Sequence, residues 1–150
     1  MPLTVVDQPY VLLTHPVDEA LSNADDNVPL EFTTIESNLG GCTVNSAKSR
    51  ITVPISGTYL VTVCISGERT NATQPGDGIQ TKILVNSSSP IDTEGFPMDV
   101  FGSEQGMEWQ FNLAIPLILS ASDYVEAVLD NINDSDATVK KGYFSVVKLH

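Results

Sequence analysis

Apolar and polar residues alternate along two long stretches of the chain. Between residues 51 and 65 every odd position is apolar except Gly57, and hydroxyl-bearing residues hold several even positions. Between residues 109 and 119 every odd position is apolar. Successive side chains of a strand point to opposite faces of its sheet, so this period of two predicts strands with one buried face. The first stretch is expected to break near residues 54–57, because Pro54 and Gly57 disturb a regular strand.

Shorter apolar stretches predict further strands, and turn-forming residues separate them. Strands are expected at residues 79–85, 124–129 and 139–149. Clusters of Gly, Pro, Asn, Asp and Ser, which suit turns, lie at residues 38–41, 70–78, 86–90 and 130–136. Helical periodicity is weak. Short strands at regular spacing are typical of a sandwich or barrel, so the predicted fold class is all-β.

Residues 1–27 differ from the rest because prolines at positions 2, 9 and 16 interrupt short apolar stretches. Proline donates no hydrogen bond to a strand ladder and is found at sheet edges and in arms. Two interpretations follow: an extra strand packed on the domain, or an extended arm that lies on another protein. We predict an N-terminal arm over residues 1–27 and one domain over residues 28–150, since 150 residues are typical of a single domain.

The charge of the chain excludes some classes of partner. Seven Lys and Arg against 19 Asp and Glu give a formal net charge of −12 at pH 7. Binding to nucleic acid or to an anionic membrane needs clustered cations, so neither partner is expected. No apolar run reaches the roughly 18–20 residues of a membrane span. The N-terminus lacks the basic region of a signal peptide, so we expect synthesis in the cytoplasm with Cys42 and Cys64 reduced.

The sequence holds no recognisable catalytic motif. The only histidines are His15 and His150, and there is no Gly-x-Ser-x-Gly elbow, phosphate loop or zinc-ligand spacing. Cys64 lies in an alternating strand and is expected to be a core thiol. We therefore predict that the protein is not an enzyme and needs no cofactor.

The acidic turn at residues 130–136 contains residue types that bind calcium. Calcium prefers six to eight oxygen ligands, and Asp130, Asp134 and Asp136 supply carboxylates. The order of residues does not match the helix-loop-helix calcium motif, because its glycine and terminal glutamate are missing. We predict a solvated loop and no metal, with these three aspartates as weak candidates.

Four segments, at residues 53–59, 83–86, 117–125 and 144–149, together resemble the complement-head and tumour-necrosis-factor-like jelly-roll family. Val53, Pro54, Gly57 and Tyr59 match its apolar-Pro-x-x-Gly-x-Tyr segment, which leads from one strand into the next. The other three segments resemble its strand ending in Val-Asn, its leucine-rich strand with a Gly-Asp turn, and its closing strand; they are residues 83–86, 117–125 and 144–149. The four segments occur in the family's order over residues 28–150.

The resemblance implies a single jelly-roll β-sandwich that assembles as a homotrimer about a threefold axis. The sequence departs from the family pattern at two positions, where Ser122 and Val146 replace the usual glycines. The strand aromatics are expected in the core or at the threefold interface, with a sugar-binding platform as the alternative; they are Tyr59, Trp109, Phe111, Tyr143 and Phe144.

Similar jelly rolls occur on bacteriophage particles, and a short acidic chain with an apolar arm is most similar to that class. The resemblance therefore implies a structural viral protein of the virion: a capsid decoration, or cement, trimer that binds the major capsid protein on the outside of a phage head. Strand pairing by the arm would stabilise the shell. The expected contact residues are Leu3, Val5, Val6, Tyr10 and Leu12. The alternative is a trimeric receptor- or carbohydrate-binding head, as in a fibre tip or a secreted ligand.

Overall fold

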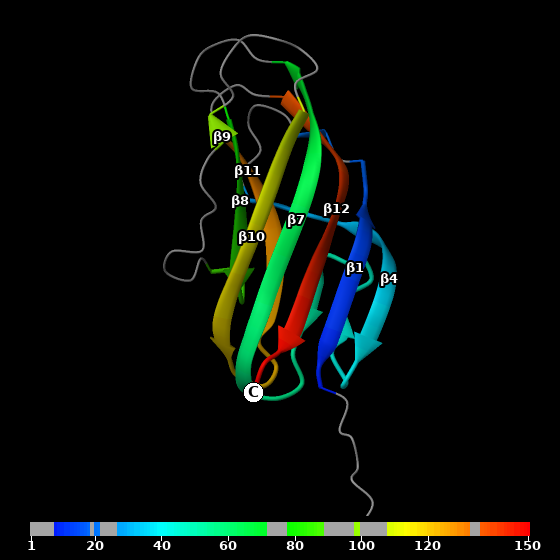
Figure 1. Ribbon diagram of the computed structural model, residues 1–150, viewed down its shortest axis with the longest axis vertical. Helices are drawn as coiled ribbons and strands as arrows, with labels where there is room; N and C mark the ends of the chain where they lie inside the picture. Colours follow the sequence, from blue (N-terminus) through cyan, green and yellow to red (C-terminus); the bar gives the residue numbers. More distant parts are fainter. Residues whose placement is uncertain are drawn as a thin grey trace, which may run out of the picture.

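The computed structural model describes residues 8–18, 20–21, 27–71, 78–88, 98–99, 108–132 and 136–150, and every regular element in these ranges is a β-strand. Antiparallel pairing arranges the strands in two sheets that lie face to face (Figure 1). The fold is a β-sandwich, so the all-β class predicted from the alternation is confirmed.

The sheet nearer the viewer in Figure 1, called here the front sheet, has the strand order β10-β7-β12-β1-β4, with β2 paired to β12. Its strands are β10 (Glu108–Leu119), β7 (Gly57–Asn71), β12 (Asp136–Lys148), β1 (Tyr10–Pro16), β4 (Phe32–Leu39) and β2 (Ala20–Leu21). The back sheet has the order β5-β6-β11-β8-β9, with β3 paired to β11. Its strands are β5 (Thr43–Val44), β6 (Arg50–Thr52), β11 (Tyr124–Ile132), β8 (Gly78–Val85), β9 (Met98–Asp99) and β3 (Val28–Pro29).

The core lies between the two sheets and follows the predicted alternation. In β7 the odd-numbered side chains from Tyr59 to Ile65 are fully buried, whereas the even-numbered ones are half-buried on the outward face. The back sheet contributes Val125, Ala127 and Leu129 to the same cluster. Burying each such large apolar side chain is worth about 1.5–3 kcal/mol, so this cluster is the main stabilising term of the sandwich.

The predicted break near residues 54–57 is where the chain changes sheets. β6 of the back sheet ends at Thr52 and β7 of the front sheet begins at Gly57. The Tyr59 hydroxyl donates a hydrogen bond to the Ile55 carbonyl oxygen at 2.7 Å and so ties the crossing to the core. A Cβ at Gly57 would lie 2.6 Å from the His150 carbonyl oxygen, so glycine is needed for the C-terminal residue to run alongside.

Part of the segment predicted as an arm lies inside the front sheet. β1 runs between β12 and β4, and its Val11 and Leu13 side chains are fully buried in the core. Pro9 and Pro16 bracket this strand rather than interrupt it, since Pro9 directly precedes β1 and Pro16 is its last residue. Residues 10–16 therefore follow the interpretation of a strand packed on the domain, and residues 1–7 lie outside the described residues.

Candidate interaction surface

A row of five outward-facing side chains crosses every long strand of the front sheet. Consecutive strand partners define it as Pro116, Leu60, Val147, Tyr10 and Leu39, on β10, β7, β12, β1 and β4 respectively. All five are apolar or aromatic, and they are half-buried or exposed. We call this set the apolar row.

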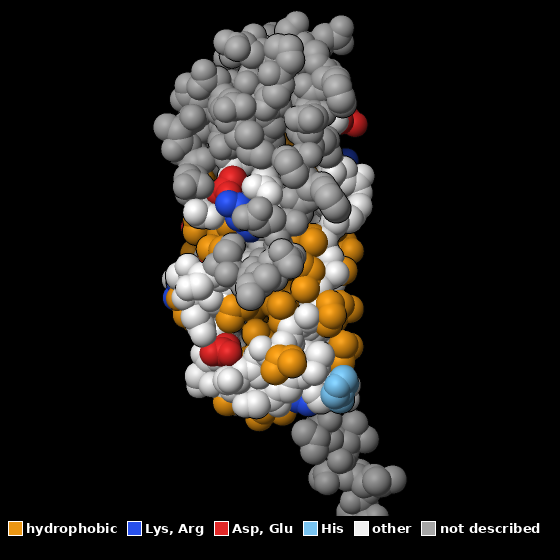
Figure 2. Space-filling model, turned by 90° about the vertical axis from the view of Figure 1, so that its left-hand side faces the viewer, with side chains coloured by type: hydrophobic (Ala, Val, Ile, Leu, Met, Phe, Trp, Pro, Cys, Tyr) orange, Lys and Arg blue, Asp and Glu red, His pale blue; other side chains and the backbone are white. Residues whose placement is uncertain are grey.

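Neighbouring positions extend the apolar character of this face. Ile118, two residues beyond Pro116 on β10, is 89% exposed, and Leu39 is 48% exposed. Hydrophobic side chains follow the right-hand flank of Figure 2, which is the outward side of the front sheet. Leu12 lies in the next row of the same face, where its strand partners are Ser145 and Ser37. Contiguous exposed apolar patches are typical of interaction surfaces.

The sequence contains a signal of this face that the apolar odd positions alone do not reveal. From Leu113 to Leu119 every position is apolar, the even ones included. Those even positions are Ala114, Pro116 and Ile118, all exposed on the outward side of β10. A strand that needs only one buried face would carry polar residues there.

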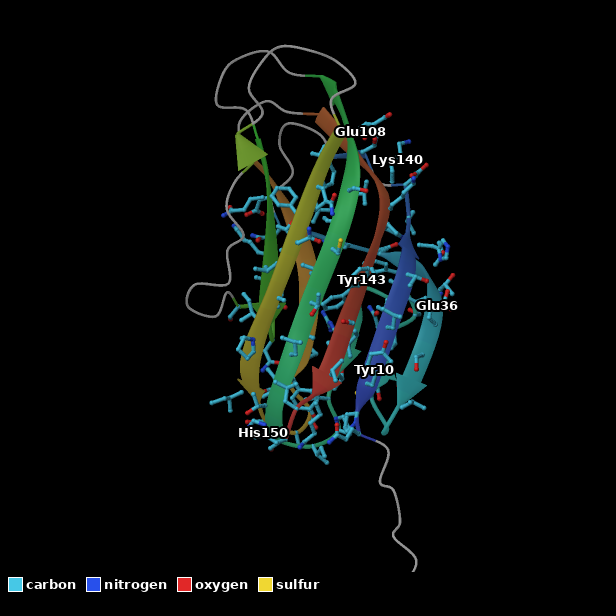
Figure 3. The ribbon with its side chains drawn as sticks, in the orientation of Figure 1. Tyr10, Glu36, Glu108, Lys140, Tyr143 and His150 are labelled. Atoms are coloured by element: carbon cyan, nitrogen blue, oxygen red, sulfur yellow. The ribbon has the colours of Figure 1, made fainter. Side chains whose placement is uncertain are left out.

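Four of the five strand aromatics lie in the core. Tyr59 and Phe144 are fully buried, and Trp109 and Phe111 are 3% and 7% exposed. Phe144 stacks on Phe32 with ring centroids 6.3 Å apart, and Trp109 packs against Phe111 at 5.7 Å. Burial raises the pKa of the Tyr59 hydroxyl. Tyr143 alone is on the outward face of the front sheet, 39% exposed (Figure 3).

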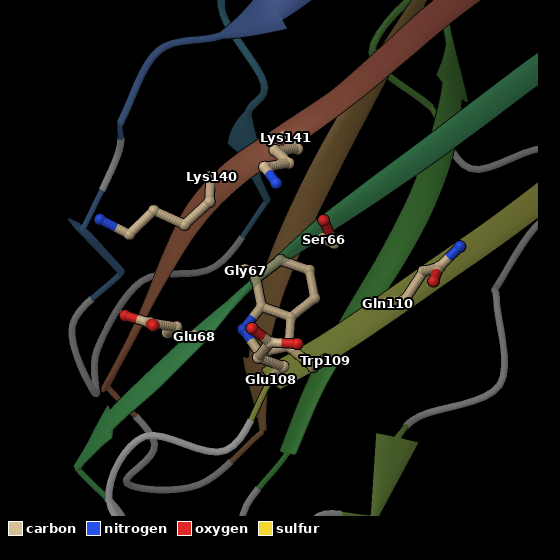
Figure 4. Close-up of a pocket in the computed structure, with 8 residues that line it drawn as sticks. All are labelled: Ser66, Gly67, Glu68, Glu108, Trp109, Gln110, Lys140 and Lys141. Carbon is tan, nitrogen blue, oxygen red and sulfur yellow. The ribbon is translucent and has the colours of Figure 1, made fainter.

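A charged hollow lies toward the opposite end of the front sheet from Tyr10, near the labelled Glu108 and Lys140 of Figure 3. Its volume is about 540 Å³. Three strands line it, as Figure 4 shows, with Ser66, Gly67 and Glu68 from β7, Glu108, Trp109 and Gln110 from β10, and Lys140 and Lys141 from β12. Sequence reasoning did not identify it, because a single sequence does not give the register that brings these residues together.

Glycine is required at the floor of the charged hollow. A Cβ at Gly67 would lie 1.9 Å from the Thr138 carbonyl oxygen and 2.5 Å from Cζ2 of Trp109. The Trp109 ring therefore packs directly against the β7 backbone. Its buried Nε1–H has no hydrogen-bond partner in the described part of the chain.

The outward face of the back sheet has a different character, because its charges are paired within the chain. Arg50 donates from Nε and from a terminal nitrogen to Oε1 of Glu126, at 3.1 and 2.9 Å. The same guanidinium lies 4.0 Å from the centre of the Tyr124 ring. Lys82 forms an ion pair with Asp130. These described charges of the back sheet are thus paired within the chain.

Of the three aspartates proposed as weak calcium candidates, the structure describes the side chain of Asp130 alone. Asp130 is 4% exposed, and besides Lys82 it accepts a hydrogen bond from the Asn27 backbone N–H at 2.5 Å. Asp136 is the first residue of β12, and Asp134 lies outside the described residues. Within the described ranges, no group of three or more His, Cys, Asp or Glu side chains could hold a metal ion.

The two cysteines lie on different sides of the front sheet. Cys42 is buried in the core, and burial raises the pKa of its thiol. Cys64 is half-buried on the outward face, where its strand partners are Asn112 and Tyr143. Both thiols are free. The prediction that Cys64 is a core thiol is wrong, because it occupies an even position of β7 and those positions face outward.

The described part of the chain contains no helix long and apolar enough to cross a membrane. No protein-family model matches the sequence, and no curated protein matches it. Among solved structures, the chain is similar to Eiger TNF from S. frugiperda, with a TM-score of 0.64 and 18% identity over 95% of this chain and 94% of that one. The fold is therefore a tumour-necrosis-factor-like jelly roll.

Proposed function

We propose that the protein is a non-catalytic, self-assembling interaction module that forms a homotrimer through the outward face of its front sheet. The apolar row is the observation that carries the proposal. It crosses all five long strands, and solvent exposure of such a face is unfavourable unless another surface covers it. The back sheet pairs its own charges and leaves no comparable patch in the described residues.

A threefold assembly is the form that this self-association takes in the jelly-roll family that the sequence resembles. The likeness of the fold to a TNF over nearly the whole chain supports the comparison. The strand order supports it further, because β10 is an edge strand and β7, β12 and β1 are interior. An edge of one copy that packs on the sheet face of the next makes a head-to-tail contact, and a threefold rotation between copies closes such contacts into a ring of three.

Light scattering tests the assembly. We expect a solution mass near three times 16.1 kDa. The variants Leu39→Glu and Ile118→Glu place a carboxylate on the outward face and should yield a folded monomer. Ile55→Glu is a matched control, since Ile55 is 47% exposed in the crossing between sheets and Leu39 is 48% exposed. A monomeric wild-type protein, or a control that dissociates equally, would overturn the proposal.

The role that we propose for the trimer is decoration of a phage head through contact with its major capsid protein. The net charge of −12 supports a role outside the nucleic-acid interior of a particle. Tyr10 and Leu12 belong to β1, so the shell contact is assigned to the segment that precedes this strand, with Leu3, Val5 and Val6 as its apolar residues.

The second candidate is a trimeric receptor- or carbohydrate-binding head, which the likeness to a TNF favours. Antibody labelling of intact particles, prepared from the organism or virus that encodes the protein, separates a decoration protein from a receptor- or carbohydrate-binding head. Labelling over the whole head surface is expected for a decoration protein. Labelling confined to fibres, or found on secreted material without particles, would support the second candidate and contradict the first.

A further inference from the structure

The charged hollow contains like charges that the single chain leaves next to each other. Glu68 and Glu108 are direct partners across β7 and β10. Both side chains are exposed, and cross-strand pairs of like charge are destabilising. We call these two residues the acidic wall of the hollow.

The opposite side of the hollow is basic. The strand partner of Lys141 is Ser66, and the register of β12 against β7 shifts between Val139 and Lys141, so that Lys140 and Lys141 are both exposed. Lys140 Nζ lies 3.7 Å from Oδ2 of Asp18, but both side chains are well exposed, and such surface pairs contribute little. We call the two lysines the basic wall.

The two walls do not neutralise each other in one chain. Within the described residues, no ion pair joins either lysine to Glu68 or Glu108. Figure 4 shows the acidic side chains on β7 and β10 and the lysines on β12. Across the described residues of the hollow, the charge therefore changes sign from acidic on β10 and β7 to basic on β12.

We propose that this hollow is an ionic contact between neighbouring copies, in which the acidic wall of one copy faces the basic wall of the next. The inference rests on the proposed trimer. In a head-to-tail ring the β10 edge of each copy lies against the sheet face of its neighbour. The sign change along the sheet then brings opposite charges together at every interface, while the apolar row supplies the hydrophobic part of the same surface.

A second copy of the chain complements both walls, whereas a separate partner that carries a single sign of charge complements only one of them. A polyanion would meet the acidic wall, and a polycation would meet the basic wall. The chain itself carries both walls in one hollow, so a second copy can present an opposite charge to each of them. Complementary charges of this kind mainly set specificity and register between the copies.

Charge reversal tests the contact directly. Lys141→Glu and Glu108→Lys should each raise the concentration at which the trimer dissociates by about tenfold or more, since like charges then meet at each interface. The double variant carrying both changes should recover most of the wild-type assembly. Analytical ultracentrifugation over a dilution series measures each value, and circular dichroism verifies that each variant is folded.

Two control variants separate the contact from the change in net charge. Lys48→Glu changes the net charge as Lys141→Glu does, and Glu31→Lys matches Glu108→Lys; both controls lie outside the hollow. The proposed contact would be overturned if the charge-reversal variants dissociate at the same concentrations as their controls. It would also be overturned if the double variant dissociates at a higher concentration than either single variant. If Leu39→Glu still gives a monomer in that case, the proposed trimer stands and only the ionic contact fails. A wild-type monomer would overturn both.

Discussion

At the scale of single residues, Ser122 holds a backbone conformation that favours glycine. Its φ is 74°, and its N–H donates to the Val53 carbonyl oxygen at 2.9 Å. We expect Ser122→Gly to raise the free energy of unfolding by about 0.5–1 kcal/mol, because glycine adopts the left-handed region without steric cost. Urea unfolding measures the change. Ser120→Gly, two residues earlier without a positive φ, should lower stability, and a gain there would contradict the explanation.

Asp123, in the same turn, makes stability depend on pH. The Asn86 amide donates to its Oδ1 at 2.8 Å and the Ser120 N–H to its Oδ2 at 2.7 Å, so the pKa of this carboxyl is lowered. The stabilisation is present above the unfolded-state pKa of about 3.9 and is lost as the pH falls through the folded-state value.

We therefore expect Asp123→Asn to be less stable than the wild type at pH 7, and the difference to narrow as the pH approaches 2. Urea unfolding at a series of pH values measures both. Glu31→Gln serves as the control, since its exposed side chain makes no hydrogen bond in the described structure. A difference for Asp123→Asn that stays constant with pH would show that the carboxylate hydrogen bonds are not its cause.

At the scale of elements, the ion pair between Lys82 of β8 and Asp130 of β11 links two back-sheet strands. The side chains are 16% and 6% exposed. Removing one partner leaves a largely buried charge, so Asp130→Ala should cost about 3–5 kcal/mol. Asp18→Ala, which removes the exposed partner of Lys140, should cost less than about 1 kcal/mol.

The double variant Lys82→Met with Asp130→Leu keeps the test informative if Asp130→Ala does not fold. Replacing a buried ion pair by apolar side chains is often neutral, so most of the lost stability should return. Thermal unfolding compares the variants. Equal losses for Asp130→Ala and Asp18→Ala would contradict the structural role of the buried pair, as would a stability that rises on adding calcium to the wild-type protein.

The elements that the sequence predicts most directly are strands in which apolar and polar positions alternate. β7 and the first half of β10 alternate in this way, and the break between β6 and β7 follows from Pro54 and Gly57. β4 could not be predicted in the same way, because it is an edge strand in which only Phe32 is buried. The apolar row and the charged hollow depend on the register between strands that are far apart in the sequence, and turn chemistry and alternation do not specify that register.

At the scale of the whole molecule, the labelling rate of Cys64 reports whether a second copy covers the front sheet in the proposed trimer. Cys64 lies on the outward face of the front sheet beside Tyr143, whereas Cys42 is buried in the core with its thiol pKa raised. The thiolate is the reactive form, so Cys42 should react slowly with a maleimide in any folded state. Cys64 should react slowly only where a second copy covers the front sheet.

We expect Cys64 labelling in the wild type to speed up at least about tenfold when the protein is diluted below the concentration at which the trimer dissociates. The Leu39→Glu monomer should label fast at every concentration, and Ile55→Glu should follow the wild type. Mass spectrometry after timed quenching assigns the label to each cysteine. A Cys64 rate that is the same in wild type and in the Leu39→Glu monomer would place the subunit interface elsewhere, even if light scattering gives a trimer. The reporter therefore tests which face assembles, which the solution mass alone does not.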